Sequence, residues 1–311
     1  MPVKTPTIAR VGSQEVALTN LDKVYWPEQG YTKRDLVDYY ASIAPYILPH
    51  LRDRPLSLVR YPEGIKGEGF YQKDAPPGMP SWVSVAPIRS KERGSYINFI
   101  LCQNVETLVW MANSGAIEIN PWLSRYSSLD NPDFAVFDID PSEGTGWDDV
   151  KKVAMIVKSL LDEWKLVGFP KVSGATGLHI YVPLEPRYSY KDVARFVGLG
   201  ASLIKGAFPD LVTLERKVKD RTGYVYIDYP QNARGQTISV VYGVRASQGA
   251  PVSIPVTWDE LAEGSRIHSQ SWNIKTALER AQAVGDLFAP VLSSPQNIDP
   301  YLRLAPPGKH N

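Results

Sequence analysis

Apolar residues recur at helical spacing in three parts of the chain. After Thr32, apolar positions three or four residues apart continue to Ile47, and Thr32 with Asp35 has the pattern of a capping box. A second run begins at Thr257 with the same kind of cap, and a third covers residues 153–164. The pattern predicts three amphipathic helices, each with one apolar face turned towards a core.

Short runs of branched and aromatic residues predict strands. They lie at 56–60, 96–101, 134–140, 178–184, 224–229 and 237–242. Helices and strands are mixed without the regular alternation of a doubly wound fold, so we expect an α+β fold with mixed or antiparallel sheets flanked by helices. Turn-forming residues at 126–132 suggest two closely packed modules, approximately 1–126 and 127–311, within a single domain 1–311.

Composition narrows the function classes. Lys and Arg number 34 against 33 Asp and Glu, which excludes a global positive field, so nucleic-acid binding would depend on local patches. The single cysteine excludes an intrachain disulfide framework and a cysteine-rich zinc site. We find neither a signal segment nor an apolar stretch of about 18 residues. We therefore expect a cytoplasmic, nucleoid-associated protein with no membrane partner.

The strongest chemical signal is a pair of acids at the end of a predicted strand. Asp138 and Asp140 alternate with apolar residues and so share one face. A second predicted strand ends at Asp228 in a similar way. Carboxylates gathered on one face suit Mg²⁺ or Mn²⁺. The alternatives are a strand running into a solvated acidic turn, and Asp228 serving only to cap the turn that follows it.

A glycine-rich segment lies between these acids. Ser173, Thr176 and the glycines around them could turn backbone amides towards a phosphate, but the spacing does not match a P-loop. His179 follows on a strand whose apolar residues face the other way. An isolated strand histidine is also commonly structural. Basic residues that include Arg221 precede the Asp228 strand, and they are equally compatible with a phosphate contact or a solvated loop.

Together these segments resemble the polymerase domain of bacterial ligase D, in the archaeo-eukaryotic primase superfamily. The resemblance runs along nearly the whole chain. It is carried by LTNLDKVYWP (18–27), GYTK (30–33), EINPW (118–122), FDIDP (137–141), SGATGLH (173–179), DYPQNARG (228–235) and VRASQGAP (244–251). It implies a primase-polymerase catalytic core. Because no ligase or nuclease segment accompanies it in the 311 residues, we expect a stand-alone form.

The resemblance implies roles for individual residues. Asp138, Asp140 and Asp228 would bind two Mn²⁺ or Mg²⁺ ions, which activate a primer 3′-hydroxyl and hold a nucleoside triphosphate while pyrophosphate leaves. The residues implied to contact the nucleotide are Ser173, Thr176, His179, Arg245, Asn120, Phe70 and Tyr71. Those implied to contact DNA are Asn20, Lys23 and Lys33, at a 5′-phosphate, and Arg221. Many relatives have Lys in place of Thr176 and His in place of Asn120, which removes cationic groups from the expected nucleotide pocket.

The implied function is nucleotide addition at DNA gaps, overhangs and breaks during non-homologous end joining. NTPs and dNTPs would be substrates, with ribonucleotides preferred, and a separate Ku protein and DNA ligase would be partners. Four alternatives stay open. The chain could be a repair primase, a gap-filling polymerase in excision repair, a metal-dependent phosphoesterase that uses the same carboxylates, or a module that bridges DNA ends without catalysis.

Overall fold

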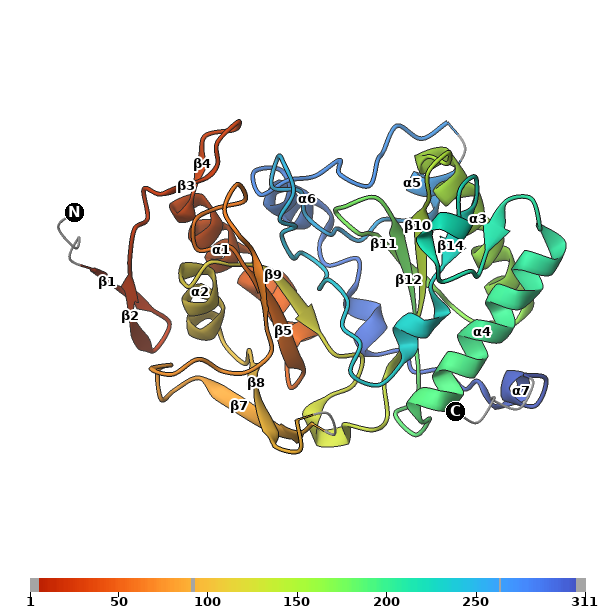
Figure 1. Ribbon diagram of the computed structural model, residues 1–311, viewed down its shortest axis with the longest axis horizontal. Helices are drawn as coiled ribbons and strands as arrows, with labels where there is room; N and C mark the ends of the chain where they lie inside the picture. The colour runs from red at the N-terminus through yellow and green to blue at the C-terminus, as the bar shows by residue number, and fades with distance from the viewer. Residues whose placement is uncertain (1–5, 91–92, 263, 306–311) are drawn as a thin grey trace. The chain divides into compact units, whose positions relative to one another are not determined.

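The computed structural model describes residues 6–90, 93–262 and 264–305 (Figure 1). The chain forms two compact units, each assembled from three segments. Unit 1 comprises Met1–Trp122, Thr237–Ser253 and Trp272–Gly285, and unit 2 comprises Leu123–Gln236, Ile254–Ser271 and Asp286–Asn311. The modules expected from the sequence were continuous, whereas in the structure the last third of the chain contributes to both units.

Unit 1 contains an antiparallel sheet in the order β6-β5-β8-β7, with β9 also paired to β5. Its strands are β1 (Thr7–Val11), β2 (Gln14–Leu18), β3 (Val24–Trp26), β4 (Tyr31–Thr32), β5 (Pro55–Arg60), β6 (Phe70–Gln72), β7 (Ser84–Arg89), β8 (Tyr96–Leu101) and β9 (Ala116–Pro121). Its helices are α1 (Lys33–Leu51), α2 (Val105–Asn113) and α6 (Ala277–Val284). The β1–β2 hairpin and the short β3–β4 pair are separate from this sheet.

Helix α1 begins where the sequence predicted. The Thr32 side chain accepts a hydrogen bond from the Asp35 N–H, and the Asp35 carboxylate accepts one from the Thr32 N–H at 2.7 Å, which completes the capping box. The apolar face of α1 is buried, and Tyr40 donates its hydroxyl to the Ile117 carbonyl of β9 at 2.7 Å. Burial of this face therefore fixes α1 against the sheet of unit 1.

Unit 2 contains a mixed sheet in the order β11-β12-β10-β14-β13. Its strands are β10 (Phe134–Pro141), β11 (Phe169–Val172), β12 (Leu178–Pro183), β13 (Val212–Thr213) and β14 (Val225–Ile227). Its helices are α3 (Trp147–Glu163), α4 (Tyr190–Ala207), α5 (Trp258–Leu261) and α7 (Asp299–Leu302), with 3-10 turns η1 (Tyr126–Ser128), η2 (Val218–Asp220), η3 (Tyr229–Asn232) and η4 (Ala289–Leu292). Among the named strands of the described residues, β13 and β14 pair in parallel and the other pairs of this sheet are antiparallel. The predicted α+β class is confirmed.

The two faces of the unit 2 sheet differ in chemistry. Phe137 and Ile180, paired across β10 and β12, share the apolar face that packs on α3 and α4 (Figure 1). Phe137 contacts Phe196 of α4 with ring centroids 6.4 Å apart, and Gly200 of α4 allows the close approach, since an added Cβ would lie 3.1 Å from the Phe137 ring. Because side chains alternate along a strand, the neighbours of Phe137 on β10 and of Ile180 on β12 point to the opposite, polar face of the sheet.

One predicted strand is wrong. Residues 237–242 form an isolated bridge at Thr237 rather than a named strand, although Ile238 and Val240 donate backbone hydrogen bonds to residues of β9. Tyr242 has φ of +66°, a left-handed conformation that ends extended pairing. The other predicted strands are confirmed, with shifts of at most two residues at their ends. Within the described residues, no helix has both the length and the apolar character needed to cross a membrane.

Candidate active site

The three predicted acids are brought together by strand register in unit 2. Asp138 and Asp140 leave the same face of β10. Asp140 pairs with Tyr226 of β14, and the Asp228 N–H donates to the Asp138 carbonyl at 2.8 Å, which continues the antiparallel pairing one step beyond β14. The backbone of Asp228 therefore lies beside that of Asp138 at the end of the neighbouring strand.

His179 lies directly across from Asp138 on β12, on the polar face as expected. Its Nε2 is 3.3 Å from Asp138 Oδ1, and its Nδ1 is 2.8 Å from Lys171 Nζ, with all three side chains largely buried. Nδ1 therefore faces the Lys171 amino group, and Nε2 faces the Asp138 carboxylate. Lys171 and Asp138 thus hold the His179 ring from its two nitrogen atoms. Sequence analysis missed Lys171, because its place beside His179 follows from the pairing of β11 with β12 and not from a sequence motif.

Asp228 is held by an aromatic neighbour rather than by a turn. Tyr226 donates its hydroxyl to Asp228 Oδ1 at 3.1 Å, and Asp228 precedes η3 without a side-chain cap bond in the described structure. Burial raises the pKa of Tyr226, and the Asp228 carboxylate raises it further, so the phenol stays a donor. Arg221 stacks on the Tyr226 ring at 3.5 Å and donates to the carbonyls of Glu215 and Arg216. The predicted basic residue therefore reaches the acids through Tyr226.

Asp138, Asp140 and Asp228 carry the donor atoms that a divalent cation would need. Carboxylate oxygens are the donors that Mg²⁺ and Mn²⁺ prefer, and strand register puts three of them at one end of one face. Across residues 6–90, 93–262 and 264–305, no group of three or more His, Cys, Asp or Glu side chains has an arrangement that could hold a metal ion. Donor chemistry and backbone placement fit such an ion, but the metal site at Asp138, Asp140 and Asp228 stays a prediction.

The glycine-rich segment folds into a closed loop against the same acids. Ser173 Oγ accepts from the N–H groups of Ala175 at 3.1 Å and Gly177 at 3.0 Å, and the Ser173 N–H donates to the Gly177 carbonyl. A Cβ on Gly177 would lie 2.4 Å from Asp140 Oδ1, so only glycine allows the loop to pass this close. Thr176 is exposed at the tip. Loop 173–177 and Asp140 therefore belong to one site.

In unit 1, Arg245 and Asn120, which were predicted to contact the nucleotide, are connected through β9. Arg245 Nε lies 3.4 Å from Glu118 Oε1, and Glu118 is two residues from Asn120, so both face the same side of the strand. Asn120 is buried and pairs with Ser57 of β5. Glu118 also accepts from the Ala246 N–H at 3.0 Å, which orients the backbone beside Arg245. Sequence analysis did not identify this acid as the partner of Arg245.

Asn20, Lys23 and Lys33 line one cavity in unit 1, with a volume of about 310 Å³. The remaining lining residues are Thr19, Tyr25, Arg60, Pro62, Glu63, Asn113 and Ser114. Asn20 has φ of +51° in a turn closed by the Lys23 N–H, which donates to its carbonyl at 3.0 Å. Arg60, at the end of β5, adds a third cation that the sequence did not reveal. Three cations converge here, and Glu63, ion-paired to Lys23 at 2.8 Å, is the acid among the lining residues.

The clustered cations perturb Lys33. Burial, together with the charges of Lys23 and Arg60, lowers its pKa to about 8, and burial is the largest of these causes. Its ammonium donates to the Thr19 carbonyl at 2.7 Å, yet this bond does not offset the loss of water and the like charges. A bound anion would relieve that cost. The cavity therefore has the electrostatic character of an anion site.

The side chains of Phe70 and Tyr71 do not form one continuous surface. Phe70 pairs with Arg60 across β5 and β6, and Tyr71 pairs with Val59, so their side chains leave opposite faces of the sheet. Phe70 lies under the Arg60 guanidinium at 5.4 Å, on the side of the cation-lined cavity. Both rings are exposed, Tyr71 more so. A base stacked on one ring would therefore not contact the other.

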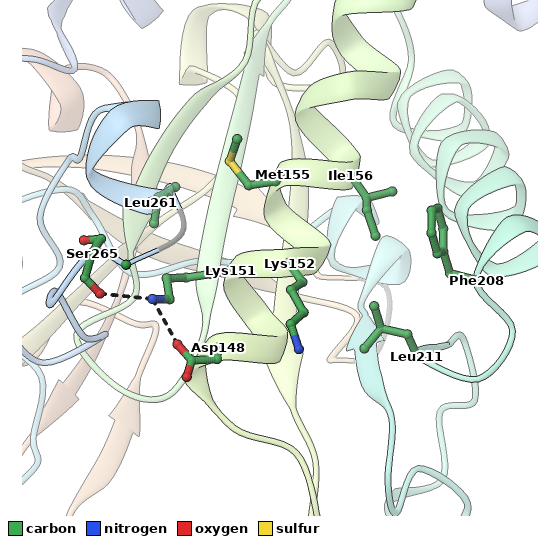
Figure 2. A pocket seen from close by; sticks show the side chains of 10 residues that line it. Asp148, Lys151, Lys152, Met155, Ile156, Phe208, Leu211, Leu261 and Ser265 are labelled. Atoms are coloured by element: carbon green, nitrogen blue, oxygen red, sulfur yellow. Dashed lines mark hydrogen bonds and ion pairs between the residues drawn. The ribbon is translucent and has the colours of Figure 1, made fainter.

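A larger cavity of about 780 Å³ lies elsewhere on unit 2. Figure 2 shows Ile156 of α3 facing Phe208 and Leu211, with Met155 on the side of α3 nearer Leu261. None of the residues predicted from the sequence lines it. Its wall contains apolar side chains and an internally paired Lys151–Asp148 contact at 3.0 Å, so size alone does not identify the reactive site.

The comparisons with known proteins agree with this geometry. Residues 32–288 match the family model described as "LigD, primase-polymerase domain". The chain is 32% identical over 284 residues to the bifunctional non-homologous end joining protein LigD of Bacillus subtilis, covering 91% of this chain and 45% of that protein. The Mycolicibacterium smegmatis multifunctional LigD is 32% identical over 280 residues, covering 89% and 36%. The chain thus spans less than half the length of these relatives.

A solved structure supports the same assignment. The polymerase domain of Mycobacterium tuberculosis ligase D, solved in complex with DNA, superposes with a TM-score of 0.84 and 29% sequence identity, covering 91% of this chain and all of that one. The chain therefore has the fold of a polymerase domain. The chain belongs to the LigD primase-polymerase family.

Proposed function

We propose that this chain adds nucleotides to DNA at gaps and broken ends during non-homologous end joining. Its family membership supports nucleotidyl transfer, and the names of its relatives support the repair pathway. The neighbour in complex with DNA supports DNA as the substrate. A Ku protein and a separate DNA ligase are proposed partners on the same grounds.

The observation that carries this proposal is the polar face of the unit 2 sheet. Asp138, Asp140 and Asp228 would hold two Mg²⁺ or Mn²⁺ ions. When bound, such ions neutralise triphosphate charge and acidify the attacking 3′-hydroxyl. His179 Nε2 lies beside the Asp138 carboxylate, and the Tyr226 hydroxyl donates to the Asp228 carboxylate. These neighbours hold the acids in position before substrate arrives.

Loop 173–177 is proposed to hold the triphosphate within unit 2. Because the Ser173 oxygen already accepts two N–H groups, its own hydroxyl proton is suited to a phosphate oxygen. The exposed Thr176 contributes its amide and hydroxyl, and His179 borders the loop on β12. In unit 1, Arg245 and Asn120 are the proposed nucleotide contacts.

The cation-lined cavity of unit 1 is proposed to hold a DNA 5′-phosphate. Lys23, Lys33 and Arg60 can each make charge-assisted hydrogen bonds to a terminal phosphate, and Asn20 adds an amide donor. A terminal phosphate carries more negative charge than an internal phosphodiester, so this cavity would distinguish the end of a gap. Phe70, on the same side of the sheet as Arg60, is proposed to stack on a neighbouring base.

Lys33 makes recognition of the 5′-phosphate dependent on pH. As pH rises through about 8, unliganded Lys33 loses its proton and the cavity loses a positive charge. The phosphate is already a dianion above about pH 7, so its charge stays constant. The preference for 5′-phosphorylated over 5′-hydroxyl gapped DNA should therefore fall between about pH 7.5 and 9.5. Lys33→Arg should flatten that profile, because guanidinium stays protonated; an unchanged wild-type preference across this range would remove Lys33 from the contact.

The proposed activity is tested by extension of a labelled primer on gapped DNA. One templated nucleotide should be added, and kcat/KM should be higher for ATP than for dATP opposite the same template base, with Mn²⁺ and with Mg²⁺. The ribonucleotide preference rests on the family resemblance. Higher efficiency with dATP in both metals would overturn it, and failure to extend the primer with any nucleotide would overturn the proposed activity itself.

A further inference from the structure

The loop proposed to hold the triphosphate is braced by a distant part of unit 2. Ser269 Oγ donates to the Ala175 carbonyl at 2.7 Å, a contact between residues 94 positions apart in the sequence. Ser269 lies in residues 264–271, which follow α5, and it is half-buried. The bond therefore connects a separate chain segment to the centre of loop 173–177.

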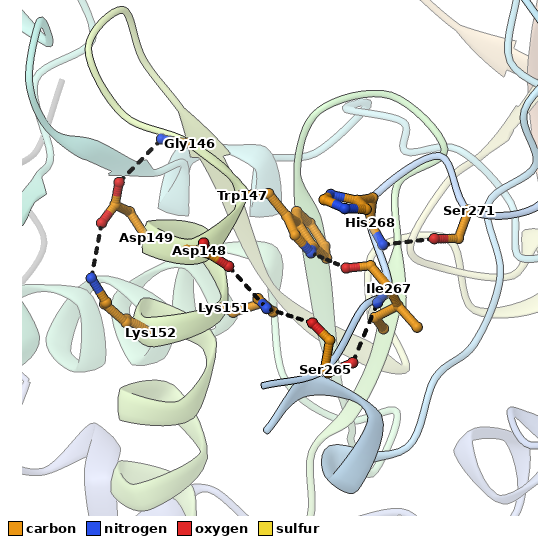
Figure 3. A network of polar contacts seen from close by, with 10 residues as sticks. All are labelled: Gly146, Trp147, Asp148, Asp149, Lys151, Lys152, Ser265, Ile267, His268 and Ser271. Carbon is orange, nitrogen blue, oxygen red and sulfur yellow. Dashed lines mark hydrogen bonds and ion pairs between the residues drawn. The ribbon is translucent and has the colours of Figure 1, made fainter. Parts of the chain in front are cut away.

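The bracing segment is itself anchored to α3. Figure 3 shows Trp147 donating its indole N–H to the Ile267 carbonyl at 2.6 Å and Lys151 donating to the Ser265 carbonyl at 3.2 Å. Lys151 is largely buried and also pairs with Asp148. Trp147 and Lys151 of α3 therefore hold the segment just before Ser269, which keeps the Ser269 hydroxyl in place.

The contact determines how the loop presents its amides. The Ala175 N–H donates to Ser173 Oγ, and the Ala175 carbonyl accepts from Ser269, so both sides of this residue are held. In a planar trans peptide the next N–H points opposite to the carbonyl. With its carbonyl directed to Ser269, the 175–176 peptide directs the Thr176 N–H away from the bracing segment. Backbone N–H groups in such turns are effective phosphate donors.

We infer that Ser269 is a positioning residue for triphosphate binding, acting through the Ala175–Thr176 peptide. The inference rests on the proposed function of loop 173–177 and adds a residue that touches no substrate. Loss of its hydroxyl frees the peptide to rotate, so the Thr176 amide is no longer oriented before the nucleotide arrives. Nucleotide affinity then falls, while the acids on the polar face keep their positions.

The test is steady-state nucleotide addition with the full chain and saturating gapped DNA. Ser269→Ala should raise KM for the nucleotide by about two- to tenfold, as expected for one neutral hydrogen bond, and should leave kcat within about twofold. Ser269→Thr, which keeps a hydroxyl, should restore most of the affinity. Ser271→Ala is the matched control, since the Ser271 hydroxyl accepts from the His268 N–H and, within the described residues, makes no hydrogen bond to the loop.

Two results would overturn the inference. One is a KM for Ser269→Ala equal to wild type, and the other is an equal rise in Ser271→Ala, which would indicate a general disturbance of the segment. Ser173→Ala separates this inference from the proposed function. If Ser173→Ala raises KM and Ser269→Ala does not, the loop binds nucleotide and the role of Ser269 is wrong. If wild type adds no nucleotide at all, the proposed function fails and the inference fails with it.

Discussion

Replacing Asp138 with asparagine should reduce nucleotide addition by roughly a thousandfold or more, the scale expected when a group that stabilises transition-state charge is lost. Asparagine has nearly the same shape as aspartate and fits beside His179, so the strand register should be retained. What it removes is the negative charge needed to hold a divalent ion. The measurement is single-turnover primer extension with saturating DNA and nucleotide.

The matched control for Asp138→Asn is Asp162→Asn. Asp162 is an exposed acid of unit 2 on α3, ion-paired to Lys158 at 2.6 Å and outside the polar sheet face. The rate of nucleotide addition by Asp162→Asn should stay near that of wild type. Affinity for gapped DNA should be unchanged in both variants, because the proposed 5′-phosphate contacts come from other residues. Extension by Asp138→Asn at a rate close to wild type would exclude this carboxylate from the mechanism.

Combined Lys23→Gln and Lys33→Gln should strongly reduce the preference for gaps that carry a 5′-phosphate, with Arg60 and Asn20 left as the remaining contacts. Each charge-assisted hydrogen bond contributes about 1.5–3 kcal/mol, so the difference in Kd between 5′-phosphate and 5′-hydroxyl DNA should shrink by at least roughly tenfold. In the wild type this difference should also shrink as salt rises, since phosphate contacts release counterions. The measurement is equilibrium binding of the two otherwise identical gapped duplexes.

Lys66→Gln is the control for this pair. Lys66 is an exposed lysine of unit 1 that pairs with Glu28 at 3.4 Å, and it does not line the cavity. It should preserve the preference for the 5′-phosphate. Thermal unfolding of the double variant should also be checked, because Lys33 is buried. A folded double variant that still distinguishes the two duplexes as strongly as wild type would place the 5′-phosphate site elsewhere.

Local sequence patterns predicted the elements that have strong local signals. The capping box at Thr32 located the start of α1, and period-two alternation placed His179 on the opposite face from its apolar neighbours. Helix α4 was not predicted, although Ser189 and Asp192 form the same type of cap. The expected strand at 237–242 is an isolated bridge at Thr237 and ends at Tyr242 in a left-handed conformation, which composition does not indicate.

Other features of the site depend on contacts between distant residues. Lys171 acquires its role through register with His179, and Ser269 through a contact with Ala175. Neither has a motif that marks it in the sequence. Arg60 likewise joins Lys33 in one cavity only after β5 and α1 are packed. Sequence patterns and family resemblance could name the acids and the loop, but the side chains that orient them required the fold.

The most direct test of the central claim is simultaneous measurement of pyrophosphate release and primer extension. Nucleotidyl transfer predicts one pyrophosphate for each nucleotide added, no release without a primer 3′-hydroxyl, and loss of both signals in Asp138→Asn. A phosphoesterase that uses the same carboxylates would hydrolyse substrate without extending the primer, and a module that only bridges DNA ends would give neither signal. Hydrolysis of nucleotide independent of primer, or no release in the presence of primer, template and divalent metal, would contradict the account.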